Sequence, residues 1–416
     1  MRFLSRLARS CLAGTLAFVR LACLCVAAFL AAAADGQLAV AGEPPADLVQ
    51  PLATLRRVGP EGQGHAEATR AWSQLAHRPA ADLPALLAAM DGANPLVRNW
   101  LRAAVDAVAD RTLASGESLP LAALEAFLRD THHDPHARWL AYDWIARVDA
   151  ARAQRLVPGL LDDPSNALRR LAIEQRQTEA QMLRTNGQLD QARTVYQTAL
   201  RAARDVDQIE ALATALRELD VPVDLRDVFG WITRWQVIGP FDNTGLAGFD
   251  RPFPPESEQR LDAEYDGKAG KVRWREWIVA DPYGRLDFNR ALGAAKEVTA
   301  YALTEFVTDQ PQPAEIRLGC KNAWKVWFNG QFLFGRDEYH RGAEIDQYRL
   351  PVTLQAGTNS LLVKVCQNEE VEDWTVEWEF QVRLTDPLGT PLRSPTSHAA
   401  APKPPPSPNP QSEPSP

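Results

Sequence analysis

Cysteine is scarce in this 416-residue sequence, and its placement leaves few covalent options. Of the five cysteines, Cys11, Cys23 and Cys25 lie near the N-terminus. The rest of the chain has only Cys320 and Cys366, so it can form at most one internal disulfide. A small scaffold held together by several disulfides is therefore excluded.

Familiar catalytic and nucleotide-binding motifs are also missing. The sequence has no His-Glu-x-x-His helix, no Gly-x-Ser-x-Gly elbow, no phosphate-binding loop and no dinucleotide fingerprint. Asp and Glu are plentiful, so counting alone does not exclude a pair of glycosidase carboxylates. We therefore expect a protein that is not an enzyme, and we keep a hydrolase as an alternative.

A surplus of positive charge is absent as well. The formal charge is −8, and it becomes −11 without residues 1–41, which contain four Arg and one Asp. Nucleic acids and anionic membrane surfaces attract basic proteins. The acidic balance argues against both partners, and its simplest meaning is solubility.

The N-terminal segment has the pattern of a signal peptide. Four arginines precede or flank an apolar run over residues 21–34, and Ala39-Val40-Ala41 is a small-x-small cleavage site. The run is too short and too rich in Ala for a membrane span. We expect residues 1–41 to be removed, with retention as an uncleaved anchor as the alternative. The remainder would be secreted, periplasmic or in the cell envelope, where Cys320 and Cys366 could pair or stay buried as free thiols.

Length and composition predict two folded domains. The chain exceeds one ordinary core, and 45% hydrophobic with 24% charged residues is typical of a globular protein. We expect an α-helical repeat (solenoid-like) domain over 45–228, followed by an antiparallel β-sandwich or jelly roll over 229–388. Residues 389–416 are predicted to be a disordered Pro-rich tail, because apolar side chains there are too few to offset the entropy of ordering.

A short motif recurs in the helical part. An Asn or Asp precedes Pro, and an Arg follows shortly after; the copies begin at Asn94, Asp134 and Asp163. In each copy the Asx residue can cap a helix and Pro suits its first position. The motif resembles the helix starts of HEAT repeats, and residues 186–203 resemble half of a tetratricopeptide unit. Either resemblance implies stacked helix pairs with a concave, protein-binding surface.

From Trp231 onward, aromatic and β-branched residues alternate with Gly and Pro, which predicts short strands. The strongest signal is Asn329-Gly330, which is typical of a tight hairpin. Trp324 and Trp327 should point to opposite faces of one strand, whereas Trp374 and Trp378 should share a face. The expected strands are 232–238, 272–279, 298–308, 316–320, 325–329, 332–335, 347–354, 361–366 and 375–384.

The residues around this hairpin resemble the galactose-binding-like jelly roll. The pattern consists of AWKVWFNGQFL at 323–333, YRLPVTL at 348–354, AGTN at 356–359 and LLVKV at 361–365. That family includes sugar-binding accessory domains of glycoside hydrolases. The resemblance implies a β-domain over about 231–384 that binds carbohydrate or packs against a neighbour. Turn geometry already explains the Gly and Asn residues of the pattern, so we do not expect them to be ligands.

The loop 334–346 is the densest polar cluster of the β-part. Its aromatic and polar side chains suit a sugar, which stacks on rings and exchanges hydrogen bonds. The candidate ligand-binding residues are Trp327, Asp337, Tyr339, His340 and Arg341. Carboxylate oxygens also suit a structural Ca²⁺ ion. The candidate metal ligands are Asp337, Glu338, Glu344 and Asp346. A solvated loop with local ion pairs is the alternative.

Three histidines within five residues, His132, His133 and His136, could in principle chelate zinc. They coincide with a repeat turn in which Asp134 is already explained as a helix cap. We therefore favour a structural turn.

Together these patterns predict an exported, non-catalytic binding protein of the cell envelope. The jelly roll would bind carbohydrate, and the helical repeats would bind an envelope protein. We expect no nucleic acid, no membrane contact beyond the signal peptide, and no cofactor other than structural Ca²⁺. The alternatives are a glycan-acting hydrolase with its site in the interdomain cleft, and a purely structural scaffold.

Overall fold

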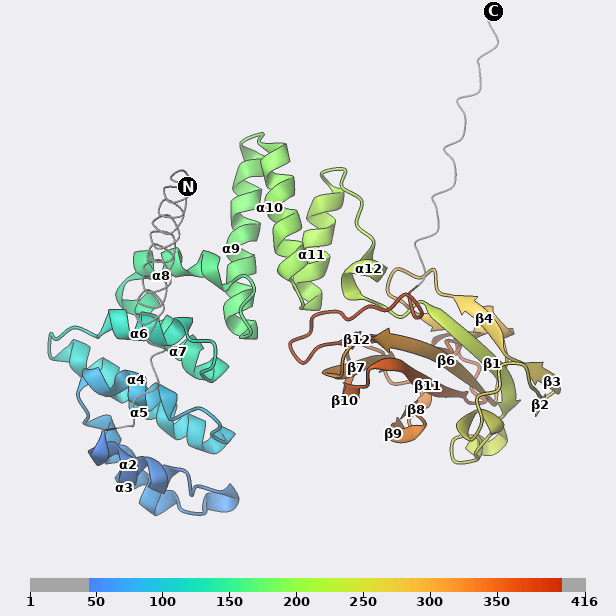
Figure 1. Cartoon of the computed structure of the whole chain (residues 1–416), viewed down its shortest axis with the longest axis horizontal. Helices are drawn as coiled ribbons and strands as arrows, with labels where there is room; N and C mark the ends of the chain where they lie inside the picture. The colour runs from blue at the N-terminus through green and yellow to red at the C-terminus, as the bar shows by residue number, and fades with distance from the viewer. Residues whose placement is uncertain (1–44, 399–416) are drawn as a thin grey trace, which may run out of the picture. The chain divides into compact units, whose positions relative to one another are not determined.

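The computed structural model describes residues 45–398 (Figure 1), so the predicted signal peptide lies outside the described residues. Helices come first along the chain and antiparallel sheets follow. Contacts divide the chain into two compact units, one up to Ala153 and one from Gln154. Within 45–398, no helix combines the length and the apolar character needed to cross a membrane.

The first unit is helical. Neighbouring helices pack on one another, α2 on α3 and α6 on α7, through buried Leu, Ala and Val side chains. The helices are α2 (Ala46–Leu55), α3 (His65–Ala76), α4 (Leu83–Ala88), α5 (Pro95–Ala114), α6 (Leu121–Arg129) and α7 (Pro135–Val148), with 3₁₀ turns at Pro60–Gly62 and Ala80–Asp82. The boundary between the units falls within α8 (Ala150–Leu156).

Two of the three predicted helix caps are confirmed. The Asn94 side chain accepts a hydrogen bond from the Val97 amide at 3.0 Å, and Asp134 accepts from the His136 amide at 2.8 Å. The third prediction is wrong, because helix α9 begins at Asn166, after Pro164 rather than with it. The Asp163 side chain instead accepts from the Ser165 amide at 2.8 Å, which makes a turn before the helix.

The second unit begins with further helices. Its 3₁₀ turn at Val157–Leu160 precedes α9 (Asn166–Thr185), α10 (Leu189–Ala202), α11 (Val206–Arg217) and α12 (Leu225–Phe229). In α10, which lies in the segment that resembles half of a tetratricopeptide unit, Ala192, Tyr196 and Ala199 are buried, whereas Leu189 at its start is exposed. These side chains share one core cluster with α11 and with Trp231, which leads into the first strand.

The strands of the second unit form two larger sheets and a small ribbon, all antiparallel. The six-stranded sheet has the order β4-β1-β6-β11-β8-β9, the four-stranded sheet β10-β7-β12-β5, and the ribbon is β2-β3. The strands are β1 (Arg234–Asp242), β2 (Glu264–Gly267), β3 (Gly270–Arg273), β4 (Arg275–Ile278), β5 (Leu286–Asp287), β6 (Val298–Thr308), β7 (Gln312–Cys320), β8 (Ala323–Phe328), β9 (Gln331–Arg336), β10 (Tyr348–Leu354), β11 (Gly357–Gln367) and β12 (Glu379–Thr385). Short helical turns lie at Thr244–Leu246, Pro254–Glu256, Asp373–Thr375 and α13 (Phe288–Leu292).

Most strand predictions hold. The predicted strand 272–279 is wrong, because the chain there forms two short strands, β3 and β4, in different sheets. The predicted hairpin joins β8 to β9, and both Asn329 and Gly330 have positive φ, 49° and 76°. The last strand begins at Glu379 rather than 375, because a 3₁₀ turn precedes it. Trp374 and Trp378 therefore do not share a face: Trp374 is 58% exposed and Trp378 is buried.

Side chains from both larger sheets meet in one core. Trp324 of β8, Ile316 of β7 and Phe380 of β12 belong to this cluster. Trp327 points to the opposite face of the six-stranded sheet, as alternation along a strand predicts. There it packs in a second cluster with Tyr301 and with residues of the segment between β1 and β4, so that both tryptophans are buried.

A buried lysine holds part of that covering segment. Lys364 of β11 donates hydrogen bonds from Nζ to the carbonyls of Phe249 at 3.0 Å and Arg251 at 2.9 Å, and to Oε1 of Glu256 at 2.8 Å. Burial lowers the pKa of Lys364, although the Glu256 carboxylate favours its charged form. Three acceptors satisfy the ammonium group, so Lys364 anchors the segment 249–256 to the sheet.

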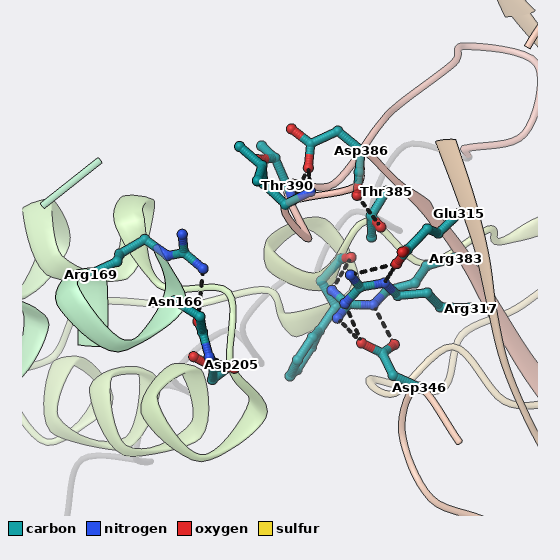
Figure 2. A network of polar contacts seen from close by, with 12 residues as sticks. Asn166, Arg169, Asp205, Glu315, Arg317, Asp346, Arg383, Thr385, Asp386 and Thr390 are labelled. Atoms are coloured by element: carbon teal, nitrogen blue, oxygen red, sulfur yellow. Dashed lines mark hydrogen bonds and ion pairs between the residues drawn. The ribbon is translucent and has the colours of Figure 1, made fainter. Parts of the chain in front are cut away.

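An aspartate between two buried arginines joins the helices to the four-stranded sheet (Figure 2). Arg383 of β12 donates to both carboxylate oxygens of Asp346, at 2.8 and 2.6 Å, and to the Phe229 carbonyl at the end of α12 at 3.1 Å. Arg317 of β7 also donates to Asp346, at 2.8 Å, and pairs with Glu315. The guanidinium of Arg383 lies 5.6 Å from the centre of the Trp231 ring.

The chain beyond β12 remains packed further than predicted. Residues 389–398, which we expected in the disordered tail, include buried Ser394 and Ser397. The Ser397 carbonyl accepts hydrogen bonds from the amides of Thr233 and Arg234, both at 3.0 Å. These backbone bonds give the segment a fixed place beside β1. The rest of the predicted tail, from 399, lies outside the described residues.

Cys320 and Cys366 are free thiols in the structure, which decides between the two states considered above. They lie on different sheets, and burial raises the pKa of Cys320 to about 12 and that of Cys366 to about 11. Because the thiolate is the reactive form, both should resist alkylation in the native protein. We expect iodoacetamide at neutral pH to label neither until denaturant is added, as read by peptide mass spectrometry. Labelling of either thiol in the folded chain would contradict this.

Removing Asp346 should strongly destabilise the second unit. Burial raises the pKa of Asp346, but hydrogen bonds and charges from Arg383 and Arg317 outweigh burial and hold that pKa below its ordinary value. Asp346→Ala leaves two buried cations without their shared partner, which typically costs about 3–5 kcal/mol. Denaturant titration should show this loss, while Glu344→Ala, an exposed carboxylate two residues away, should change the unfolding free energy little.

The same contact should make stability depend on pH. A carboxyl group whose folded pKa lies below its unfolded pKa stabilises the fold fully above the unfolded value, about 4, and loses that effect as pH falls further. The difference in unfolding free energy between wild type and Asp346→Ala should therefore shrink below about pH 4. A difference that stays constant to pH 2 would show that the pKa of Asp346 is the same in the folded and unfolded chain, so that the two arginines do not lower it.

Candidate functional site

The predicted ligand-binding loop lies between β9 and β10, and its aromatic residues face the interior. Asn243 donates a hydrogen bond to the Tyr339 hydroxyl at 3.1 Å, and burial raises the pKa of Tyr339. His340 bonds through Nε2 to Oδ1 of Asn368 at 2.8 Å, and its ring meets the edge of Trp374 at 5.4 Å. Both side chains therefore brace neighbouring loops.

The other predicted ligands do not gather at one point. Trp327 lies in the second cluster on the face of the six-stranded sheet, where it contacts Phe332. Arg341 pairs with Glu338 at 2.7 Å on the surface. Asp337 is exposed at the surface, and desolvation together with the charge of Asp250 raises its pKa.

The four predicted calcium ligands are likewise separated. Asp346 is held by Arg317 and Arg383, and Glu338 by Arg341, while Glu344 is exposed. In residues 45–398, no three side chains among His, Cys, Asp and Glu are arranged to hold a metal ion. The three histidines of the turn 132–136 are also engaged separately. His132 pairs with Asp130, His133 with Asp91 and His136 with Asp134.

The same loop nevertheless borders a cleft of about 420 Å³. Gly342, Ala343 and Ile345 form one wall, and the face of the four-stranded sheet that points away from the core forms the floor. Contact between loop and sheet is close: a Cβ atom at Gly319 would collide with the carbonyl oxygen of Glu344. The volume lies within the usual range for small-molecule sites, about 300–1,000 Å³.

Alternation along the strands explains which side chains enter the cleft. Phe380 and Val382 point into the core between the sheets, so Glu379 and Gln381 point the other way. Gln381 lies opposite Gly319 on the neighbouring strand. Lys321, just beyond β7, and Glu377, just before β12, extend the same polar face.

Some charged side chains of the cleft have a close partner of opposite charge, and others do not. Lys321 forms an ion pair with Glu377. Arg285 donates to Asp281 at 2.9 and 3.2 Å but lies 3.8 Å from the nearest Glu379 oxygen. Burial raises the pKa of Glu379, Arg285 lowers it, and the nearby carboxylates raise it further.

A smaller hollow of about 260 Å³ adjoins the cleft. Arg285 and Glu379 line both spaces, and the second is completed by Trp277, Asp281 and Asp287. Arg285 and Glu379 thus lie between the two hollows, which we together call the extended site. Donors and acceptors alternate along it, a combination suited to a molecule rich in hydroxyl groups.

Sequence reasoning missed this site. Glu377 and Glu379 alternate with Trp378 and Phe380, which is the period of a strand with one buried and one open face. This alternation indicates a polar face on the strand. It does not indicate that Arg285, about ninety residues earlier in the sequence, lies beside that face. Gly342, Ala343 and Ile345 of the loop line the cleft, whereas none of the predicted ligand-binding side chains does.

Comparisons with known proteins give no family for this chain. No family model matches it, and no curated protein matches it. Among solved structures, a β-glucosidase from Kluyveromyces marxianus in complex with glucose matches 36% of this chain and 16% of its own, with 9% identity and a TM-score of 0.24. An anti-sigma factor domain-containing protein from Clostridium clariflavum matches 42% of this chain and 48% of its own, with 10% identity and a TM-score of 0.22. The chain thus spans less than half the length of these structures.

Proposed function

We propose that this protein is an exported, non-catalytic binding protein whose sheet region binds carbohydrate in the cleft on the four-stranded sheet. The observation that carries the proposal is the set of polar side chains on one open face, Lys321, Glu377, Glu379 and Gln381. Neighbouring strands and their ends hold these groups, so they are positioned before a ligand arrives. Tyr283 adds an aromatic ring to the lining.

The finer architecture is part of the same proposal. We infer that the two larger sheets form a jelly-roll-like sandwich, which their shared core supports. We infer that the helices form a repeat array that offers a surface to an envelope protein. Support comes from Arg98, which follows one motif copy and donates to the cap Asp134 of the next at 3.1 Å. Export rests on the pattern of residues 1–41, and a structural Ca²⁺ ion remains a prediction for the loop.

The alternative of a glycan-acting hydrolase also has a specific observation. Glu377 and Glu379 line the same cleft, and the raised pKa of Glu379 suits a group that donates a proton. Such an enzyme would release new reducing ends from a bound glycan. A purely structural scaffold, the third possibility, would bind no glycan in the cleft.

Binding to polysaccharides tests the proposal. A glycan array followed by calorimetry on the full chain should identify a ligand, and Lys321→Ala should weaken its binding about tenfold, the usual effect of losing one charged hydrogen bond. Lys271→Ala is a matched control, because Lys271 also pairs with a carboxylate but lies on the β2-β3 ribbon.

Three outcomes would count against it. If no polysaccharide binds, the carbohydrate proposal is wrong. If Lys321→Ala and Lys271→Ala weaken binding equally, the glycan binds elsewhere. If bound glycan is cleaved, as measured by a reducing-end assay, and Glu379→Gln stops the cleavage, the hydrolase replaces the binding protein.

A further inference from the structure

Glu379 is the carboxylate in the extended site whose charge is least compensated. Asp281 takes both hydrogen bonds of the Arg285 fork, Glu377 pairs with Lys321, and Asp287 accepts from the amides at the start of α13. The cation that faces Glu379 is Arg285, whose Nη1 lies 3.8 Å from the Glu379 Oε1, beyond hydrogen-bond reach.

The Glu379 carboxylate is also without a hydrogen-bond donor from the part of the chain that the structure describes. Its side chain is only 21% exposed, so water reaches it incompletely. A partly desolvated carboxylate without donors is costly, and a ligand that supplies a donor removes that cost. Since Glu379 lines both hollows, a ligand crossing from one to the other passes this group.

The surroundings of Glu379 favour a donor with positive charge. Asp281, Asp287 and Glu377 lie near enough to disfavour its ionised form. The two hollows hold three cations, Arg285, Lys321 and Arg290, which are outnumbered by the four carboxylates. A ligand cation would relieve the repulsion among them, whereas a hydroxyl group would only supply a hydrogen bond.

Each of the two hollows has an aromatic side chain in its lining, which limits the shape of a ligand. Trp277 lines the smaller hollow and Tyr283 the larger one. Aromatic side chains offer flat apolar faces to sugar rings and favourable contact to ammonium groups. A chain of at least two sugar units could touch both rings while an amine lies beside Glu379.

We infer that the extended site selects a glycan bearing a protonated amine, that is, an oligosaccharide of de-N-acetylated amino sugars, with the ammonium group bound by Glu379. This inference rests on the proposed carbohydrate binding and deepens it by naming the ligand class. Acetylation of the amine removes its charge and adds bulk, so the acetylated oligomer should bind more weakly.

Calorimetry on the full chain tests the selection, with oligomers of four to five glucosamine units as probes. We compare them with N-acetylglucosamine oligomers and with neutral glucose oligomers of equal length, at pH 6. The glucosamine oligomers should bind about tenfold more tightly than either. Glu379→Gln, which keeps the shape of the side chain and removes its charge, should reduce that preference to twofold or less.

A control and a second readout keep the test decisive. Glu276→Gln should leave the preference intact, because Glu276 pairs with Arg234 on β1. Thermal melting should show that both variants fold. If Glu379→Gln does not fold, the comparison of the three ligands on the wild-type protein still decides the question, since it needs no variant.

Each result has a distinct meaning. Equal binding of glucosamine and neutral oligomers would overturn the charge selection and leave carbohydrate binding standing. No binding of any oligomer would overturn both. If lysine-rich peptides bind as tightly as the glucosamine oligomers, and depend equally on Glu379, the site recognises an amine on a peptide and the glycan class is wrong.

Discussion

The contact between Asp346 and the two buried arginines is the constraint on which the second unit depends. A single carboxylate, 6% exposed, neutralises Arg383 and shares Arg317 with Glu315, so two positive charges can be buried on adjacent strands. Arg383 also reaches the last carbonyl of α12, which ties the helices to the sheet. Removing any member would leave a charge in a place that water cannot reach, and this makes the junction an all-or-none arrangement.

The cleft follows from that junction. Asp346 ends the loop whose residues Gly342, Ala343 and Ile345 form one wall, so its attachment to β7 and β12 fixes the wall over the sheet. Gly319 lies under the loop because any larger residue would meet the Glu344 carbonyl. The polar floor owes its position to strand alternation, and the wall owes its position to an ion pair. Strand alternation and the ion pair therefore act together to produce one cleft.

How far the sequence predicts this molecule depends on the range of the interactions involved. Strand 298–308 and the hairpin at Asn329-Gly330 were predictable, because residue alternation and turn geometry act over a few neighbours. The start of α9 was misplaced because a local bond of Asp163 competes with helix capping. The contacts made by the loop 334–346 were not predictable for a different reason: the partners of Tyr339, His340 and Asp346 come from distant segments. The spacing of residues along the sequence does not indicate contacts between segments that lie far apart in it.

The two unpaired thiols have a consequence for how this fold is maintained. Cys320 and Cys366 are buried on different sheets and form no disulfide. Within residues 45–398, the fold is therefore held together by non-covalent contacts alone. Oxidising and reducing surroundings should then be equivalent for the folded state. The β-part can reach its structure without disulfide-forming catalysts, and its persistence outside a cell would depend on how rarely the core opens to expose those sulfur atoms.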